Sequence, residues 1–420
     1  MLTIKIAARV LAVLALGALV AVLAFAVNVA LGMRAASLST GTVGGLAIGA
    51  PVEIRRDGRG VPHIRARNEH DLFFAQGYVE ASDRLFQLDL LRRFVYGQLS
   101  EVLGNGALDA DERARVVPVT ALVQAQWRKL RPHDRQMLSA FADGVNAAMR
   151  TEPAPVEFRL LMYRPRPWKA QDALAVGFAT VMDLTDTWDD IAGRNGKHLP
   201  LSDPCYDAPV IEGLARVSDP TTCTAKTAFI EELLHPKPPV GSNEWAAGAA
   251  HTSTGRALLA NDPHLRLQIP GVWYLVDLSA PGYHAAGAAL AGTPGVILGH
   301  NDRLAWGATN GTVASLSVFK ASPTHLDARA WQIETFRVRL RRDVTKRYYR
   351  TPSMFGATTQ RGGFVLVKWS AYSDPKSPLL AFDALDRAGS IEDGERALAV
   401  YPGPTQNFVL ADTSGRVAYT

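Results

Sequence analysis

The hydrophobic pattern of this chain changes at Ser242, and this change constrains the fold more than any other feature of the sequence. Before Ser242, apolar residues recur at steps of three and four, as at positions 74, 78, 81, 85 and 88, which predicts helices with one buried face. After it, short apolar runs are separated by glycine turns, which predicts strands. The chain is therefore expected to be an α+β protein, mostly helical in its first half and mostly antiparallel β in its second.

The pattern also predicts individual elements. Residues 51–64 alternate around Asp57-Gly58 and predict a β-hairpin, and Asn68 is placed to cap the helix that follows. Gly97 to Gly106 should end that helix. Further helical stretches are expected at 119–150 and 172–182, with a proline-punctuated loop at 153–167. Strands are expected at 245–251, 257–264, 272–278, 285–290, 296–298 and 304–307, and extended chain at 337–349 and 363–369.

The N-terminal segment has no charged side chain from residue 10 to residue 33, between Lys5 and Arg9 on one side and Arg34 on the other. As a helix it would be about 36 Å long, enough to cross a hydrocarbon core of about 30 Å. Ala24-Phe25-Ala26 resembles a signal-peptidase site. An uncleaved membrane anchor and a cleaved signal peptide both remain open, and either predicts export to the periplasm or another extracytoplasmic space. A buried core helix is the third alternative.

Composition excludes several classes of function. The net charge is only +5, from 45 basic and 40 acidic residues, and no basic stripe is interleaved with aromatic residues, so nucleic acid is not an expected partner. The only cysteines are Cys205 and Cys223, which excludes a cysteine-rich zinc site and leaves one disulfide or two thiols as alternatives. The proline-rich residues 195–241 are interpreted as a linker or spacer. The expected regions are therefore 1–36, 37–194, 195–241 and 242–420.

An acidic cluster lies between residues 183 and 190, with Asp189 and Asp190 at its end. Carboxylates at this density are typical calcium ligands, so these two aspartates are candidate metal ligands. A solvated turn is the alternative interpretation.

Ser242 itself suggests a chemistry. A serine hydroxyl is a weak nucleophile that needs a base beside it. If the chain is cut between Gly241 and Ser242, the freed α-amino group, with a reference pKa of about 7.7–8.0, supplies that base. The glycine leaves room at the carbonyl that the hydroxyl would attack. A turn serine remains the alternative when the Gly-Ser-Asn motif is taken alone.

Several motifs in order resemble the penicillin acylase family of N-terminal-nucleophile hydrolases. They are Gly241-Ser-Asn-Glu-Trp245, Asn261-Asp-Pro-His-Leu265, and Gly295-Val-Ile-Leu-Gly-His-Asn301 continuing into Trp306-Gly-Ala-Thr-Asn310. Residues 52–64, 83–93 and 165–168 resemble the family's α chain. The resemblance implies a four-layer αββα sandwich. It also implies a precursor that cuts itself into an α chain and a β chain, with Ser242 opening the β chain.

The resemblance also implies roles for single residues. Ser242 would be the nucleophile and its own amine the base. His264 would hold the amine or hydroxyl in register, since this chain has histidine where the cephalosporin and homoserine-lactone acylases have it. Asn310 would offer a backbone N–H to the oxyanion hole, and Asn407 its side-chain amide.

The chain departs from the family at three points. The family's calcium loop would follow Asn310, but residues 312–319 contain no aspartate, so no cofactor is expected to be required and calcium stays doubtful. Leu265 and Leu298 stand where penicillin G enzymes have phenylalanines in the acyl pocket, and an aliphatic lining suits an alkyl chain at least as well as a benzyl group. Residues 242–420 are also shorter than the family's β chain, which suggests that a C-terminal part is missing.

Two classes of function follow from these observations. The first is an exported, self-processing amidohydrolase that cleaves a small acyl-amide substrate through an acyl-enzyme at Ser242. The second is an inactive relative or binding module held at the membrane by the N-terminal helix.

Overall fold

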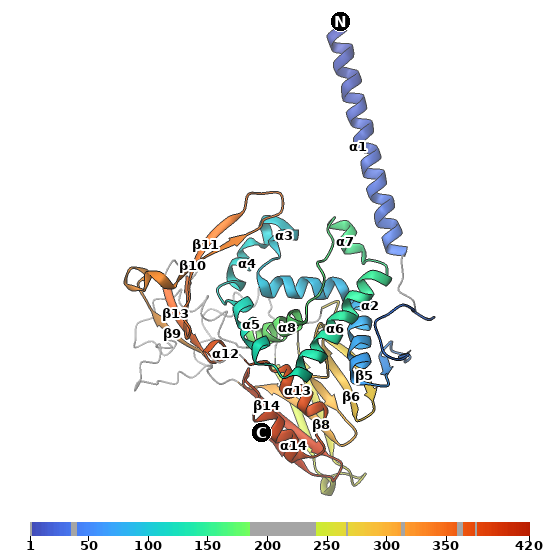
Figure 1. Cartoon of the computed structure of the whole chain (residues 1–420), viewed down its shortest axis with the longest axis vertical. Coiled ribbons are helices and arrows are strands. Elements are labelled where there is room, and N and C mark those ends of the chain that lie inside the picture. Colours follow the sequence, from blue (N-terminus) through green and yellow to red (C-terminus); the bar gives the residue numbers. More distant parts are fainter. Residues whose placement is uncertain are drawn as a thin grey trace, which may run out of the picture.

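The computed structural model describes residues 2–34, 40–184, 241–265, 268–311, 316–358, 364–373 and 376–420 (Figure 1). Its helices are α1 (Leu2–Arg34), α2 (Glu69–Tyr96), α3 (Ser100–Leu103), α4 (Leu108–Ala114), α5 (Val119–Lys129), α6 (Pro132–Thr151), α7 (Val156–Leu160), α8 (Ala170–Asp183), α12 (Ser370–Ser373), α13 (Leu379–Asp386) and α14 (Ile391–Leu398). Residues 195–240 of the predicted spacer, both cysteines, Asp189 and Asp190 lie outside the described residues.

The strands lie almost entirely after Ser242, as the sequence pattern predicts. They are β1 (Glu53–Arg56), β2 (Pro62–Arg65), β3 (Gly241–Ala247), β4 (Leu258–His264), β5 (Trp273–Ala280), β6 (Tyr283–Leu290), β7 (Leu298–His300), β8 (Leu304–Asn310), β9 (Leu316–Lys320), β10 (Trp331–Phe336), β11 (Val344–Tyr349), β12 (Phe355–Thr358), β13 (Phe364–Trp369), β14 (Gln406–Asp412) and β15 (Val417–Tyr419).

An eight-stranded sheet organises the molecule, with strand order β1-β2-β5-β6-β7-β8-β14-β15. The β1–β2 hairpin is the one predicted around Asp57-Gly58. Its strand β2 runs parallel to β5, and the other neighbours in this sheet are antiparallel. The region before Ser242 therefore shares one sheet with the region after it, and a cut at Gly241–Ser242 would leave the two halves hydrogen-bonded to each other.

Helices cover one face of this sheet. Asn68 caps α2 as predicted, accepting a hydrogen bond from the Asp71 N–H, and α2 packs on β2 and β5 while α13 and α14 pack on β6 and β14. The crossing of α2 and α6 is very close, because a Cβ built on Gly144 would lie 1.8 Å from the Phe74 carbonyl oxygen. Glycine at this point lets the two backbones touch, and the core lies between these helices and the sheet.

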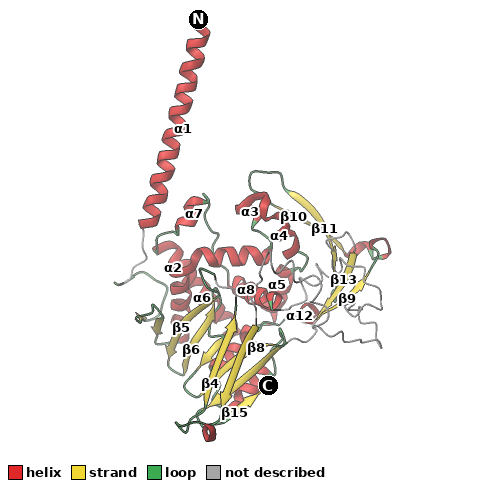
Figure 2. Cartoon of the chain, turned by 180° about the vertical axis from the view of Figure 1, so that it is seen from behind, coloured by secondary structure: helices red, strands yellow, loops and turns green. Residues whose placement is uncertain are grey.

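The β3–β4 hairpin covers the opposite face, packing on β8 and β14 (Figure 2). Side chains of β8 alternate between the two sides: Leu304 contacts the helix α14 at Gly394, whereas Gly307 contacts Asn261 of β4. The described elements thus form helix, sheet and sheet layers. The second helical layer of the expected four-layer sandwich is not among them, and it remains a prediction.

Several local predictions were wrong. The strand expected at 245–251 ends at Ala247, and Ala249–His251 form a short 3-10 helix instead. The helical stretch 119–150 is two helices, α5 and α6, because Pro132 cannot continue a helix and instead begins one. The loop 153–167 contains the short helix α7. Residues 337–343 form a turn rather than extended chain, so only β11 of that segment is a strand.

The helix α1 contains one stretch long and apolar enough to span a membrane, Val13–Ala30, with a mean hydropathy of 2.5. None of that stretch is buried against the rest of the protein. This exposure argues against the third alternative for the segment, a buried core helix.

Candidate active site

Ser242 lies in β3, opposite Pro263 of β4 in the hairpin register. Along β3 the exposed residues Gly241, Asn243 and Trp245 alternate with the half-buried Ser242 and Glu244. Because alternate side chains of a strand lie on the same face, the side chains of Ser242 and Glu244 both point toward the large sheet.

The inner face of the hairpin meets β8 and β14 through a chain of hydrogen bonds. The Thr309 hydroxyl donates to Glu244 Oε1 over 3.2 Å, and Asn407 Nδ2 donates to Thr309 Oγ1 over 3.2 Å. The Tyr419 hydroxyl donates to Asn407 Oδ1 over 2.7 Å. This fixes the orientation of the Asn407 amide on the Ser242 side of the sheet. Because an amide nitrogen carries two hydrogens, one N–H of Asn407 remains for another acceptor.

The backbone N–H of Asn310 is oriented by the register of β8 and β14. Gly311 donates its N–H to the Thr405 carbonyl over 2.7 Å, so Gly311–Thr405 and then Thr309–Asn407 are the hydrogen-bonded pairs of this antiparallel ladder. The intervening residue, Asn310, therefore directs its N–H away from β14. On that side the neighbouring strand β7 does not extend as far as Asn310, since the nearest residue of β8 that it pairs with is Trp306.

Asn261 of β4 fixes the distance between the hairpin and this free edge of β8. Its Nδ2 donates to the carbonyls of Asn243 and Ala308, each over 3.0 Å, and its Oδ1 accepts the Ala308 N–H over 3.2 Å. The side chain therefore takes the place of a neighbouring strand at Ala308, which lies past the start of β7. A Cβ on Gly307 would come within 2.9 Å of the Asn261 side chain, so glycine is what permits this approach.

Within this site, the carboxyl group of Glu244 has an unusual electrostatic environment. Burial raises the pKa of its carboxyl above the ordinary value, although the hydrogen bond from Thr309 opposes this effect. The Oε2 atom is buried and has no hydrogen-bond partner among the described atoms. A carboxyl in this environment favours its neutral form more than an exposed one does.

His264 lies on the other face of the hairpin from the Ser242 side chain. It is the Cα partner of Gly241, and its Nδ1 lies 3.8 Å from where a Gly241 Cβ would be. Its Nε2 is 2.8 Å from Asp262 Oδ2 and 3.4 Å from Asn243 Nδ2. In this uncut chain the imidazole is thus beside the residue whose carbonyl would be attacked, rather than beside the serine hydroxyl.

The two predicted acyl-pocket leucines have different surroundings. Leu298 begins β7 and packs against the hydrophobic core. Leu265 follows β4 and is half-buried. Neither contact identifies an acyl pocket, so that role stays a prediction.

One group of side chains among the described residues has metal-ligand spacing, His133, Asp134 and Asp383. It is not a promising metal site, because Arg131 donates two side-chain bonds to Asp134 and Arg387 donates two to Asp383. These guanidinium groups already supply the positive charge that a cation would bring.

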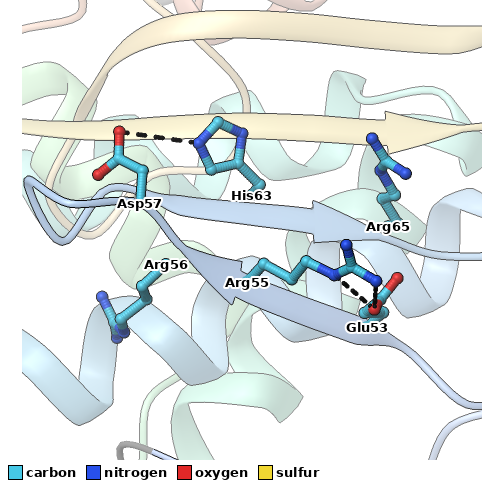
Figure 3. Close-up of a pocket in the computed structure, with 6 residues that line it drawn as sticks. All are labelled: Glu53, Arg55, Arg56, Asp57, His63 and Arg65. Atoms are coloured by element: carbon cyan, nitrogen blue, oxygen red, sulfur yellow. Dashed lines mark hydrogen bonds and ion pairs between the residues drawn. The ribbon is translucent and has the colours of Figure 1, made fainter.

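A shallow pocket of about 170 Å³ lies on the β1–β2 hairpin and is lined by Glu53, Arg55, Arg56, Asp57, His63 and Arg65 (Figure 3). Strands β1 and β2 form the end of the sheet opposite β14 and β15. The pocket therefore belongs to a different part of the molecule from Ser242.

The sequence profile of the family described as penicillin amidase matches residues 51–420. The chain belongs to the penicillin amidase family. Its N-terminal helix lies before the matched region, and all the candidate residues around Ser242 lie within it.

Curated relatives of this penicillin amidase family member include two acyl-homoserine lactone acylases named QuiP. That of Pseudomonas aeruginosa is 33% identical over 278 residues, which cover 61% of this chain and 33% of the relative. That of Pseudomonas fluorescens (strain Pf0-1) is 30% identical over 400 residues, covering 86% of this chain and 49% of the relative. The chain thus spans a third to a half of these relatives. A solved penicillin G acylase from Alcaligenes faecalis is 23% identical, with a TM-score of 0.38 over 42% of this chain and 34% of that one.

Sequence reasoning named the motifs but missed four residues that build this site: Glu244, Asn261, Thr309 and Tyr419. Glu244 and Asn261 lie inside quoted motifs, so their spacing from Ser242 and His264 was a usable signal. Thr309 also lies inside a quoted motif, next to Asn310, whereas Tyr419 had no such signal because its partner Asn407 comes from another strand.

Proposed function

We propose that this chain is part of an exported, self-processing amidohydrolase whose nucleophile is Ser242. In the precursor, Ser242 Oγ attacks the Gly241 carbonyl, which converts the peptide bond into an ester and frees the α-amine. Water then hydrolyses the ester, leaving a carboxylate on Gly241 and a new amino terminus on Ser242. His264, beside Gly241, is proposed to hold this segment in register during the cut.

In the mature enzyme the same hydroxyl attacks an acyl-amide substrate. The α-amine of Ser242 accepts the hydroxyl proton and returns it to the leaving amine, which gives an acyl-serine ester that water hydrolyses. The negative charge on the carbonyl oxygen is proposed to be stabilised by the Asn310 backbone N–H and by the second N–H of Asn407. Removal of one such donor typically costs about 2.7–4 kcal/mol in the barrier.

The register of β3 over β8 and β14 is the observation that carries this proposal. Ser242 faces the sheet beside Glu244, the Glu244 carboxylate is bonded to Thr309, and Thr309 is the partner of Asn407 in both backbone and side chain. Nucleophile and amide donor are thus presented to the same side of one sheet. The mixed sheet gives further support, since strands from both halves would keep the cut chains together.

The proposed substrate is a small molecule with an acyl-amide bond. Relatives are named penicillin acylase and acyl-homoserine lactone acylase, and both names describe removal of an acyl group from an amine. Leu265 and Leu298 are proposed to line the acyl site, which favours an aliphatic chain over an aromatic one. No cofactor is needed for these steps, and a calcium site at Asp189 and Asp190 remains an untested proposal. The proposed location is periplasmic or extracytoplasmic, with α1 as signal or anchor.

The test compares two purified proteins of full natural length, the parent and its Ser242→Ala variant. Mass spectrometry should find a fragment that begins Ser-Asn-Glu-Trp in the parent and an intact precursor in the variant. An active parent protein with an uncut Gly241–Ser242 bond would refute the mechanism. Labelling by a serine-directed acylating reagent then separates enzyme from inactive relative, because only an enzyme is labelled at Ser242.

A further inference from the structure

Two residues of the described chain other than glycine have positive φ angles, Met162 at 49° and Leu340 at 60°. Glycine or asparagine usually occupies this left-handed region, and a bulky residue held there indicates local backbone strain. Both side chains are nevertheless apolar and point into solvent, with exposed fractions of 69% and 95%. In a turn that faces water, neither the positive φ angle nor the exposed apolar side chain of these residues stabilises the fold.

These two turns belong to one surface. The backbone N–H of Arg339 donates to the Ser100 carbonyl over 3.0 Å, and its guanidinium donates to the carbonyls of Val102, over 3.0 Å, and Leu161. One arginine therefore holds together α3, the turn after α7, and the β10–β11 turn at residues 337–343. Leu103 and Leu160 are exposed on the same segments, at 45% and 48%. We call the surface formed by Leu103, Leu160, Met162 and Leu340 the apolar rim.

The apolar rim lies at the end of the molecule from which α1 projects, as both views show (Figures 1 and 2). The Arg159 guanidinium of α7 donates to Asn28 Oδ1 of α1 over 2.7 Å. Asn28 is near the end of the stretch Val13–Ala30 that is long enough to span a membrane. If that stretch crosses a bilayer, α7 is held at the level of the lipid headgroups.

The charge around the apolar rim also fits a lipid bilayer as its partner. Segments 100–106, 156–164 and 337–343 together carry six arginines and three acidic residues, and Arg341 and Arg342 are exposed next to Leu340. Arginines near an anionic bilayer are attracted to its negatively charged surface. Surfaces that insert shallowly into a membrane interface typically combine exposed apolar side chains with flanking cationic ones.

We propose that the apolar rim docks on the bilayer that α1 spans, inserting Met162 and Leu340 among anionic phospholipids. The body of the protein would then be held in one orientation on the membrane surface, rather than hanging freely from α1. Strand β4 lies toward the end of the body opposite α1 (Figure 2), so docking at the apolar rim would leave the β3–β4 hairpin uncovered.

The test uses the full chain reconstituted in vesicles of phosphatidylethanolamine and phosphatidylglycerol. The photo-reactive residue p-benzoylphenylalanine replaces Leu340 in one variant and Met162 in another, and mass spectrometry identifies what each crosslinks to. Leu258→p-benzoylphenylalanine is the matched control, because Leu258 is also exposed, at 56%, but lies on β4. Leu19→p-benzoylphenylalanine in α1 reports insertion of the anchor.

Lipid adducts at positions 340 and 162, with none at 258, are the expected result. Adducts at 340 should also fall several-fold when phosphatidylcholine replaces the anionic mixture. Lipid adducts at position 19 together with none at 340 and 162 would overturn the proposal, as would crosslinks from 340 to a second protein chain. Leu340→Gly, which suits the positive φ, should leave the unfolding temperature unchanged or higher, showing that the leucine is not there for stability.

Discussion

Asn261 offers the sharpest test of how the structure builds the site. Its side chain makes three hydrogen bonds, two to Ala308 of β8 and one to the Asn243 carbonyl of β3. Only the two bonds to Ala308 join the hairpin to β8, so at about 1 kcal/mol for each bond, Asn261→Ala should weaken docking of the β3–β4 hairpin by about 2 kcal/mol. That corresponds to about 30-fold in the docking equilibrium. Since Ser242 reaches β8 and β14 only through this hairpin, cleavage at Gly241–Ser242 should slow by a comparable factor.

The assay is a time course of precursor cleavage in the full-length protein, followed by gel electrophoresis and mass spectrometry. Asn261→Asp should give an intermediate rate, because an aspartate still accepts the Ala308 N–H but donates nothing. Asn301→Ala is the matched control: Asn301 also bonds several backbone groups, among them the Ala388 carbonyl and the Leu304 N–H, but it does not touch the hairpin.

The expected pattern is therefore slow cleavage for Asn261→Ala and near-normal cleavage for Asn301→Ala, even though both variants lose thermal stability. Parent-like cleavage in Asn261→Ala would refute the idea that this side chain sets the position of Ser242. Equal slowing in both variants would show that general destabilisation, not hairpin docking, controls the reaction.

Three further predictions concern separate parts of the chain. Asn407→Ala should lower amidase turnover by about 100-fold or more while sparing precursor cleavage, and an unchanged turnover would remove Asn407 from the site. Burial raises the pKa of Glu80 to about 8, so the folded state holds an extra proton between the ordinary carboxyl pKa and that value, and stability falls as pH rises through this window. Glu80→Gln should therefore gain unfolding temperature relative to the parent as the pH rises from about 5 to about 8, and parallel pH profiles would contradict this. Gly144→Ala should destabilise by about 3 kcal/mol, because its Cβ would overlap the Phe74 carbonyl. Gly106→Ala, where nothing lies within 4 Å, is the control in a thermal unfolding experiment, and equal losses would argue against a tight crossing.

Much of the fold followed from local patterns that the sequence carries. The β1–β2 hairpin, the Asn68 cap, the buried face of α2 and the change from helices to strands at Ser242 each depend on residues close together in the chain. The split between α5 and α6 was missed although Pro132 marks it, because the apolar pattern continues across the break. Strands β14 and β15 were not predicted. Within β14, the sequence analysis named only Asn407, as a site residue.

The sequence by itself predicted Ser242 as the nucleophile and Gly241–Ser242 as the bond to be cut, because these two residues are neighbours and their chemistry is local. It could not determine which face of the hairpin each side chain occupies. Only the tertiary structure placed Ser242 and Glu244 toward β8 and β14, and His264 on the opposite face. The physical reason is that side-chain direction in a strand reverses at every residue, so a contact between distant strands depends on a register that is set by packing and not by the motif.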